Sequence, residues 1–593
     1  MLKELVRALL RRADESNPAP EAVESISAPD RLHVCITQAA AHAAAGDHAA
    51  AAKLYRESLD LQPQDPRIWC NFGAELDAIG QAGEAELAYR RALAIDPELA
   101  EAWYNLGQLQ QTRGSVNDCE SCYRSALALL DGARDRELWH LVYNNLGLLL
   151  QSLGRLKDAE SLYREALVAV PTDAGLHSNL LFLLSLDELL APEQVAAEYR
   201  RWGELHADPL SVSTEPHANS PEPDRLLRVG YVSADFRSHA IASFAEPVLA
   251  CHDRRTVRVY CYSNGRRTDD VTRRLRALAD EWRDIAALSD DEAARLVRND
   301  SIDILVDLSG HTDGNRLLLF ARRPAPIQIT WLGFLGGTGM AAMDLHLTDA
   351  YIDPVGVAEP LYRERLLRLP HGNGCYHPPR DAPEVNALPA LERGYVTFGS
   401  FNNFPKLTEP TKRAWARLLA GLPGARLRVV GAPAGDACDR MLEIFESEGV
   451  FADRIDVLGR LPFHAYLEQA LQVDIALDPY PYNGGTTTLE SLWMGVPVVT
   501  RAGRAGSSRC SSSYLSNVGL PDLIAGSWEE YIDIASRLAG DLPRLAGLRA
   551  GLRARMRESA LLDAPGFTAD LEALYRSAWQ EWCAGRARDG QPC

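Results

Sequence analysis

The sequence has no excess of positive charge. Its formal net charge is −19, from 62 Lys and Arg against 81 Asp and Glu. A nucleic-acid backbone and an anionic membrane surface both need a basic face, so neither is expected as the main partner. Long apolar runs are also missing, because none approaches the roughly 18 residues that cross a bilayer. The opening stretch MLKELVRALLRRADES is charged and amphipathic rather than a secretory signal. We therefore expect a cytoplasmic protein.

A cysteine framework is missing as well. The 11 cysteines are scattered and odd in number, which favours a reducing compartment. Cys119 and Cys122, in DCESCYRSA, form the one closely spaced pair. Their spacing fits half of a zinc or redox site, but no second CxxC or His pair lies nearby. It also places two small side chains on one helix face, so we expect them to pack.

Two common nucleotide-binding motifs are absent. No GxGxxG follows the predicted strand 228–233, and GxxxxGK[ST] does not occur. Dinucleotide oxidoreduction and P-loop hydrolysis therefore lose their sequence support. The contents of apolar residues (46%) and charged residues (24%) are ordinary for globular domains. At about 150 residues a domain, the length predicts three or four of them.

Residues 40–170 repeat with a period of 34. Trp69 and Trp103 are one period apart, as are Tyr55, Tyr89 and Tyr123. This is the tetratricopeptide period, and a glycine at each inter-helix turn and a proline closing each unit support it. The segment LLDGARDREL widens one interval to 40, which predicts a longer turn. We predict an all-α tetratricopeptide superhelix over 1–205 with a groove for an extended acceptor, and a linker over 206–225.

One asparagine recurs at the same place on successive first helices of these repeats: Asn71, Asn105, Asn145 and Asn179. A repeated amide facing the groove offers a donor and an acceptor to a peptide backbone without reading its side chains. A helix-packing hydrogen bond within each repeat explains the spacing equally well.

After the linker, β-branched runs alternate with helical stretches. They are 227–233, 258–263, 302–310, 326–333, 395–401, 426–431, 454–459, 473–478 and 496–500. Such alternation indicates parallel sheets covered on both faces. A Pro-rich break at 377–394 divides the series, so we expect two Rossmann-like domains, 226–385 and 386–593, with a cleft between them.

The stretch YNGGTTTLES follows a predicted strand and opens a helix. Free backbone N–H groups and the positive end of the helix dipole then face the loop, and the hydroxyls of Thr486, Thr487 and Thr488 add donors. Together they predict a diphosphate site, with Glu490 placed for a ribose or sugar hydroxyl. An ordinary N-cap would account for Thr487 and Glu490 alone.

Lys406, in TFGSFNNFPKLTEP, follows another strand end and can neutralise a leaving phosphate as a point charge. Asp474 and Asp478 lie four residues apart on one strand face, but we interpret them as strand-end caps rather than metal ligands. With a helix N-terminus, threonines and a lysine supplying positive potential, we expect no metal and no cofactor.

The repeats, together with RVGYVSADFRSH, RPAPIQITWLGFLGGTG, FGSFNNFPK and PYNGGTTTLESLWMGVPVVT, resemble the protein O-GlcNAc transferase and SPINDLY family over about residues 40–585. The resemblance implies a multidomain protein: a tetratricopeptide region, then a GT-B α/β catalytic region. It also implies a metal-independent, inverting enzyme that moves a sugar from a nucleotide diphosphate to Ser or Thr of proteins, and oligomers through the repeats are possible.

The resemblance also assigns roles to residues. It places Lys406 and Asn403 on the donor diphosphate with the threonines, Gly336 near the donor sugar, and Glu490 on the ribose. His239 matches the active-site histidine, as a base or as an orienting hydrogen-bond donor.

Two departures bear on the donor. Gly485 and Tyr466 stand where the animal transferases have histidines, and LVDLSGHTDGN and VTFGSFNN are closer to the SPINDLY branch, which in plants uses GDP-fucose. We expect UDP-GlcNAc as the donor, with GDP-fucose or another sugar nucleotide as the alternative. A tetratricopeptide adaptor with a dead second half is the alternative of another class.

Overall fold

The computed structural model describes residues 27–211 and 216–588, so the opening stretch discussed above lies outside the described residues. These residues form two compact units, one of residues 27–149 with 168–170 and one of 150–167 with 171–588. Within them, no helix combines the length and apolarity that crossing a membrane requires.

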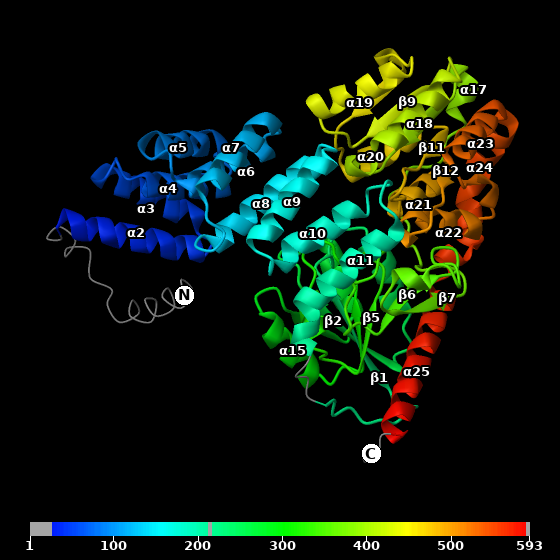
Figure 1. The fold of residues 1–593 in the computed structure, drawn as a ribbon, viewed down its shortest axis with the longest axis horizontal. Coiled ribbons are helices and arrows are strands. Elements are labelled where there is room, and N and C mark those ends of the chain that lie inside the picture. The colour runs from blue at the N-terminus through cyan, green and yellow to red at the C-terminus, as the bar shows by residue number, and fades with distance from the viewer. Residues whose placement is uncertain (1–26, 212–215, 589–593) are drawn as a thin grey trace. The chain divides into compact units, whose positions relative to one another are not determined.

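Helices of the predicted repeats make up the first unit (Figure 1). They are α2 (Ala28–Ala44), α3 (His48–Leu61), α4 (Pro66–Ala78), α5 (Ala82–Ile95), α6 (Ala100–Thr112), α7 (Val116–Leu129) and α8 (Arg136–Ser152). Gly80 and Gly114 end first helices at φ of 79° and 78°, which favours glycine. Gly73 lies under Tyr89, where an added Cβ would be 2.7 Å from the ring. Gly73 thus lets Tyr89 of the second helix pack closely against the first helix.

Two smaller expectations concern these repeats. The turn between α7 and α8 is longer than the turn between α5 and α6, but most of the extra residues extend α8, which has 17 residues against 13 in α6. Cys119 and Cys122 are buried in α7, at 0% and 6% exposure, so they pack as expected. Burial raises the pKa of Cys119 to about 12 and that of Cys122 to about 11, so neither thiol is reactive at neutral pH.

The second unit begins with α9 (Leu156–Ala169), α10 (Ala174–Leu184) and α11 (Pro192–Trp202) and continues with two parallel sheets. The first sheet has the order β3-β2-β1-β4-β5-β6-β7. Its strands are β1 (Leu227–Ser233), β2 (Val257–Ser263), β3 (Glu281–Asp284), β4 (Ile304–Asp307), β5 (Ile327–Thr330), β6 (Leu345–Asp349) and β7 (Arg365–Leu369).

The second sheet has the order β10-β9-β8-β11-β12-β13. Its strands are β8 (Thr397–Ser400), β9 (Arg426–Val430), β10 (Ile455–Leu458), β11 (Ile475–Leu477), β12 (Val498–Arg501) and β13 (Ile524–Ala525). Each of the nine predicted runs overlaps one of the observed strands. The sequence analysis misses β3, β6, β7 and β13, which are short or carry charged residues such as EWRD and RLLRL.

The predicted linker is helical at its start. A π-helix (Gly203–Ala207) continues α11, and α12 (Asp208–Ser211) follows, so residues 206–211 are not extended. The cause is packing: a Cβ on Gly203 would lie 1.9 Å from Gly339 O, so this helical segment fits tightly against the loop after β5.

The last helix belongs to a different core from the one we expected. α25 (Ala564–Arg588) lies beside the first sheet (Figure 1). Its buried residues Phe567, Leu571 and Trp579 join the core under β1, β4 and β5, rather than the second domain, to which 386–593 was assigned. An apolar helix stripe shows that a helix packs but not on which sheet.

Candidate functional site

Both sheets have a switch point, where strand order reverses: between β1 and β4 in the first sheet, and between β8 and β11 in the second. In parallel sheets, ligands bind outside the carboxyl ends of the strands at such points. His239 follows β1, Lys406 follows β8, and the threonine run follows β11. The predicted catalytic and phosphate-binding residues therefore lie on the loops that the fold rule favours.

The loops after β8 and β11 are bonded to each other. Lys406 Nζ donates to Asn483 O at 2.8 Å and lies 4.4 Å from the centroid of the Tyr482 ring. Thr487 Oγ1 donates to Asn402 Oδ1 at 3.0 Å. The structure thus brings the predicted lysine and one predicted threonine together.

Asn402, rather than Asn403, makes this contact. Asn403 is exposed, and its backbone O accepts from Lys406 N at 2.9 Å. Adjacent asparagines in FGSFNNFPK cannot be distinguished by sequence reasoning, because only the turn conformation decides which side chain faces the next loop.

The helix α21 (Thr486–Trp493) begins at the end of the glycine loop, with Gly485 as its N-cap. Gly484 has no room for a side chain, since an added Cβ would lie 2.5 Å from the hydroxyls of both Thr487 and Thr488. Thr486 is partly exposed at the first turn of the helix. Backbone N–H groups at this helix end, with the hydroxyls of Thr486 and Thr487, form an arrangement suited to an anion.

Thr488 is placed differently from the other two threonines. It is 2% exposed, and its hydroxyl lies 2.8 Å from Ser511 Oγ. Its hydroxyl therefore serves packing, and we withdraw Thr488 from the predicted donor site. Because a helix turns about 100° per residue, three consecutive threonines cannot all face one ligand.

Two buried aspartates hold the strand ends, as predicted. Asp474 accepts from the backbone N of Ala390 at 3.0 Å and of Thr397 at 2.8 Å. Asp478 accepts from Gly484 N at 2.7 Å and from Thr500 Oγ1 at 2.6 Å. Asp478 thus fixes the glycine loop to the end of β11.

Burial shifts the charges at this centre. It lowers the pKa of Lys406 to about 8, against the opposing influence of Asp478. It raises the pKa of Asp478 to about 6, although hydrogen bonds and Lys406 favour the ionised carboxylate. The lysine is therefore largely charged at neutral pH and becomes neutral only slightly above it.

An aromatic cluster surrounds Glu490. Tyr466 Oη donates to Glu490 Oε2 at 2.8 Å, and burial raises the pKa of Glu490 to about 7. The Tyr466 ring stacks on Phe463, with centroids 6.0 Å apart, and meets Phe401 edge-on at 5.6 Å. A carboxylate beside aromatic rings suits the hydroxyls and base of a nucleoside. Phe401 and Phe463 were missed by the sequence analysis, because isolated aromatics carry no motif.

His239 lies on the first-sheet side. Its side chain is 39% exposed, and its Nδ1 is 3.5 Å from Asp235 Oδ2 and accepts from Ile241 N at 3.3 Å. Burial lowers its pKa, while Asp235 acts in the opposite direction. The neutral ring with an anchored Nδ1 is compatible with either expected role, base or orienting donor.

Tyr376, which the sequence analysis did not single out, connects the two sides. Its ring lies 5.9 Å from that of Phe244, on the helix α13 (Ala242–Cys251) after His239. Its hydroxyl is buried without a hydrogen-bond partner among the described residues, and burial, with Glu490, raises its pKa.

Gly336 lies in the loop after β5. An added Cβ would be 2.7 Å from the Phe334 ring and 2.8 Å from the hydroxyl of Tyr199 on α11. Glycine is therefore required here by the close approach of α11.

The four asparagines have mixed environments. Asn71 is exposed and the other three are partly exposed. Asn105 Nδ2 lies 3.4 Å from Cys70 Sγ, and Asn145 Nδ2 donates to Tyr104 Oη at 3.1 Å. Asn179 lies close enough to Tyr163 to oppose the effect of burial on the tyrosine pKa. The bonds of Asn105 and Asn145 join neighbouring repeats rather than helices within one repeat, and the remaining exposure leaves the groove-lining role a prediction.

No group of three or more His, Cys, Asp or Glu side chains that could hold a metal occurs in residues 27–211 and 216–588. Metal independence stays a prediction, since the site's cations and helix N-terminus only make a divalent ion unnecessary.

The chain is similar to known proteins over the region that carries this site. The model of "Glycosyl transferase family 41" matches residues 199–374 and 387–571, and tetratricopeptide models match 78–114 and 141–167. An O-GlcNAc transferase mutant of Thermobaculum terrenum superposes with a TM-score of 0.80 at 38% identity, covering 88% of this chain and 98% of that one.

Curated plant relatives match over the same region. The Petunia hybrida protein "Probable UDP-N-acetylglucosamine--peptide N-acetylglucosaminyltransferase SPINDLY" is 40% identical over 62% of this chain and 40% of its own length. The SEC protein of Arabidopsis thaliana is 31% identical over 61% of this chain and 38% of its own. The chain thus spans about two fifths of these relatives. Since the family match covers more than half of the sequence, the chain belongs to glycosyl transferase family 41.

Proposed function

We propose that the protein transfers a sugar from a nucleotide diphosphate to Ser or Thr hydroxyls of protein acceptors. The proposed donor is UDP-GlcNAc, and the transferred sugar is GlcNAc. The observation that carries the proposal is the joined pair of loops at the second switch point. There, Lys406 lies 2.8 Å from Asn483 O beside the N-terminus of α21. The names of the relatives and the tetratricopeptide repeats support a protein acceptor.

In this proposal the donor diphosphate lies at the start of α21. The N–H groups of the first turn and the hydroxyls of Thr486 and Thr487 bind its oxygens. As the acceptor oxygen attacks the anomeric carbon, the bond from that carbon to the diphosphate oxygen breaks, and negative charge develops on the leaving group. Lys406 stabilises that charge, so no metal ion is required.

The acceptor hydroxyl must lose its proton during the attack. His239 takes the proton or orients the hydroxyl, and its neutral state suits both roles. Attack from the face opposite the diphosphate inverts the anomeric centre.

At the other end of the donor, Glu490 binds the ribose, and the aromatic cluster around Tyr466 packs on the base. GDP-fucose is the second candidate donor. It is favoured by 40% identity to a SPINDLY protein against 31% to a SEC protein, and by Gly485 and Tyr466 at the two positions noted above.

A panel of UDP-, GDP- and dTDP-sugars tests the proposal. The matching donor at 100 times its dissociation constant should stabilise the protein by about 2.7 kcal/mol. It should also be consumed when a Ser/Thr peptide library is added, with the peptide gaining the mass of the sugar. An inactive adaptor would show neither effect with any donor, and that result would end the proposal.

A further inference from the structure

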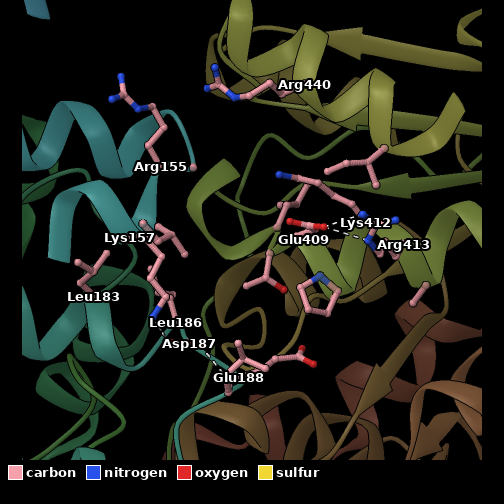
Figure 2. A pocket seen from close by; sticks show the side chains of 18 of the residues that line it. Arg155, Lys157, Leu183, Leu186, Asp187, Glu188, Glu409, Lys412, Arg413 and Arg440 are labelled. Carbon is pink, nitrogen blue, oxygen red and sulfur yellow. Dashed lines mark hydrogen bonds and ion pairs between the residues drawn. The ribbon is translucent and has the colours of Figure 1, made fainter. Parts of the chain in front are cut away.

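A cavity lies beside the loop that carries Lys406. It has a volume of about 730 Å³ and is bounded by the turn before α9, by α10, and by the starts of α18 (Glu409–Ala420), α19 (Asp436–Ser447) and α23 (Trp528–Gly540). Figure 2 shows its side chains, with Arg155 and Lys157 on one side and Lys412, Arg413 and Arg440 on the other. All of these elements belong to the second compact unit.

Most charges lining this cavity are already paired. Arg155 Nε lies 2.6 Å from Asp158 Oδ2. Lys157 Nζ lies 2.7 Å from Asp187 Oδ2, and Arg413 Nη2 lies 2.7 Å from Glu409 Oε1. Within each pair the two charges neutralise each other, so these three pairs offer no net charge to a ligand.

Lys412 differs from these cations. It is 8% exposed, and its ammonium forms no hydrogen bond or ion pair within the described residues, although the carboxylate of Glu409 favours its charged form. Its Nζ lies 4.7 Å from the centroid of the Phe404 ring, and 3.9 Å from where a Cβ of Gly154 would be. Burial, with Arg440, lowers its pKa to about 8.

Of the cations that line this cavity, Arg440 is the second with no carboxylate of the described residues within ion-pair distance. It is exposed, and its Nη2 reaches only Leu153 O, at 3.5 Å. It is close enough to act on the charge of Lys412. A buried ammonium beside a guanidinium is costly, and Glu409 opposes this cost only in part, so a bound anion would stabilise the pair.

We propose that this cavity binds a small organic anion, with a phosphate or carboxylate held by Lys412 and Arg440. Its volume lies within the range of small-molecule sites. The remaining wall is largely apolar and would cover the non-polar part of such a ligand: Leu153, Leu156, Leu183, Leu186, Leu407 and Ile444. The net charge of −19 disfavours a nucleic acid as the source of the anion.

The site lies next to the donor-binding turn. Phe404, under the Lys412 ammonium, is in the same 3-10 turn as Lys406 (Phe404–Lys406). Thr408 and Thr411, at the start of α18, donate to Tyr480 O at 3.1 and 2.9 Å. An anion on Lys412 would therefore steady the turn that carries Lys406, and the cavity is placed to act as an effector site.

The test measures binding alone, so it does not depend on the proposed transferase activity. Inorganic phosphate and phenyl phosphate are titrated by calorimetry into the full chain carrying Lys406→Met, which weakens the donor phosphate site. We expect saturable binding, with phenyl phosphate at least about tenfold tighter because its ring buries apolar surface. Equal affinities for the two ligands would overturn the apolar part of the proposal.

Three further substitutions locate the bound anion. Adding Lys412→Met should weaken binding about 10- to 100-fold, the loss typical of a charged hydrogen bond, and Arg440→Gln about tenfold. Lys157→Met, which removes a paired cation of the same cavity, should change binding less than about threefold. Arg440 is exposed, so that variant should fold even if Lys412→Met does not. Binding that resists both substitutions, or no saturable binding at about 10 mM, would overturn the site.

Discussion

The two sheets carry the same carboxylate anchor at their switch points, and we propose a phosphate site at only one of them. Asp307 ends β4, is buried, and accepts from Ser309 N at 3.0 Å, Gly310 N at 2.8 Å and Thr330 Oγ1 at 2.9 Å. Asp478 follows β11 and accepts from Gly484 N and Thr500 Oγ1. Burial raises the pKa of both carboxyls to about 6.

The difference lies in what the anchored loop supports. The loop after Asp307 packs against Phe334. A Cβ added to Gly310 of this loop would lie 2.4 Å from the Phe334 side chain. The loop after Asp478 opens a helix and receives Lys406 from the neighbouring loop. The carboxylate thus anchors a loop in both halves. In our proposal, the lysine and the free helix end give only the second half a phosphate site.

Removing the lysine is the strongest way to break this comparison. Lys406→Met should lower kcat by about 10²-fold or more, because the departing diphosphate loses its cation. Steady-state kinetics with the matching donor measures the loss. Lys157→Met, a surface change on α9, is the control and should stay within about twofold of wild type. Wild-type turnover in the Lys406 variant, with saturable donor binding, would refute the role.

Replacing each of the two aspartates by asparagine separates their roles in the two halves. Asp478→Asn should lower kcat/KM by about 10- to 100-fold, because a loosened glycine loop misplaces the diphosphate. Asp307→Asn should leave kcat/KM within about threefold and affect only the free energy of unfolding. The contrast fails if both variants lose activity equally.

The same pair has a pH signature in stability. Because folding raises each carboxyl pKa from 3.8 to about 6, the folded state binds more protons between these values. The free energy of unfolding should therefore fall as pH rises from about 4 to about 6, and either Asn variant should fall less steeply. Denaturant titrations across this interval measure the slope, and identical slopes in wild type and both variants would contradict it.

Activity should also depend on pH through groups of both halves. Binding of the donor ribose needs ionised Glu490, so kcat/KM should rise as this carboxyl ionises near pH 7, and loss of the His239 proton contributes at lower pH. It should fall above about pH 8 as Lys406 loses its proton. Glu490→Gln should move the acidic limb to lower pH and leave the alkaline one. A flat profile from pH 6 to 9 would exclude this assignment.

A smaller effect is expected from the repeats. Replacing Asn71, Asn105, Asn145 and Asn179 together by Ala should weaken glycosylation of a protein acceptor while donor hydrolysis stays near wild type. Each lost hydrogen bond is worth roughly 0.5–1.5 kcal/mol. If the amides are structural, the variant should instead melt at a lower temperature, since the bond of Asn145 to Tyr104 is lost. Normal melting with wild-type glycosylation would rule out both interpretations.

Chelation should have no effect on activity. The helix N-terminus and Lys406 already supply positive potential at the diphosphate, so EDTA should leave the rate within experimental error. Activity that is lost in EDTA and restored by manganese would show that the diphosphate site needs a metal ion.

The sequence by itself determined the repeats, the alternation of strands and helices, and the positions of Lys406, Thr487 and Glu490. Each of these leaves a local pattern: a 34-residue period, a β-branched run, or polar residues directly after a strand. Only the tertiary structure decided that Asn402 rather than Asn403 meets Thr487, and that Thr488 faces Ser511. It alone also placed α25 against the first sheet and left Lys412 buried with no carboxylate of the described residues within ion-pair distance. The physical reason is that a local pattern fixes which face of an element is apolar or polar, whereas the partner of that face comes from chain segments far away in the sequence, whose approach no local pattern records.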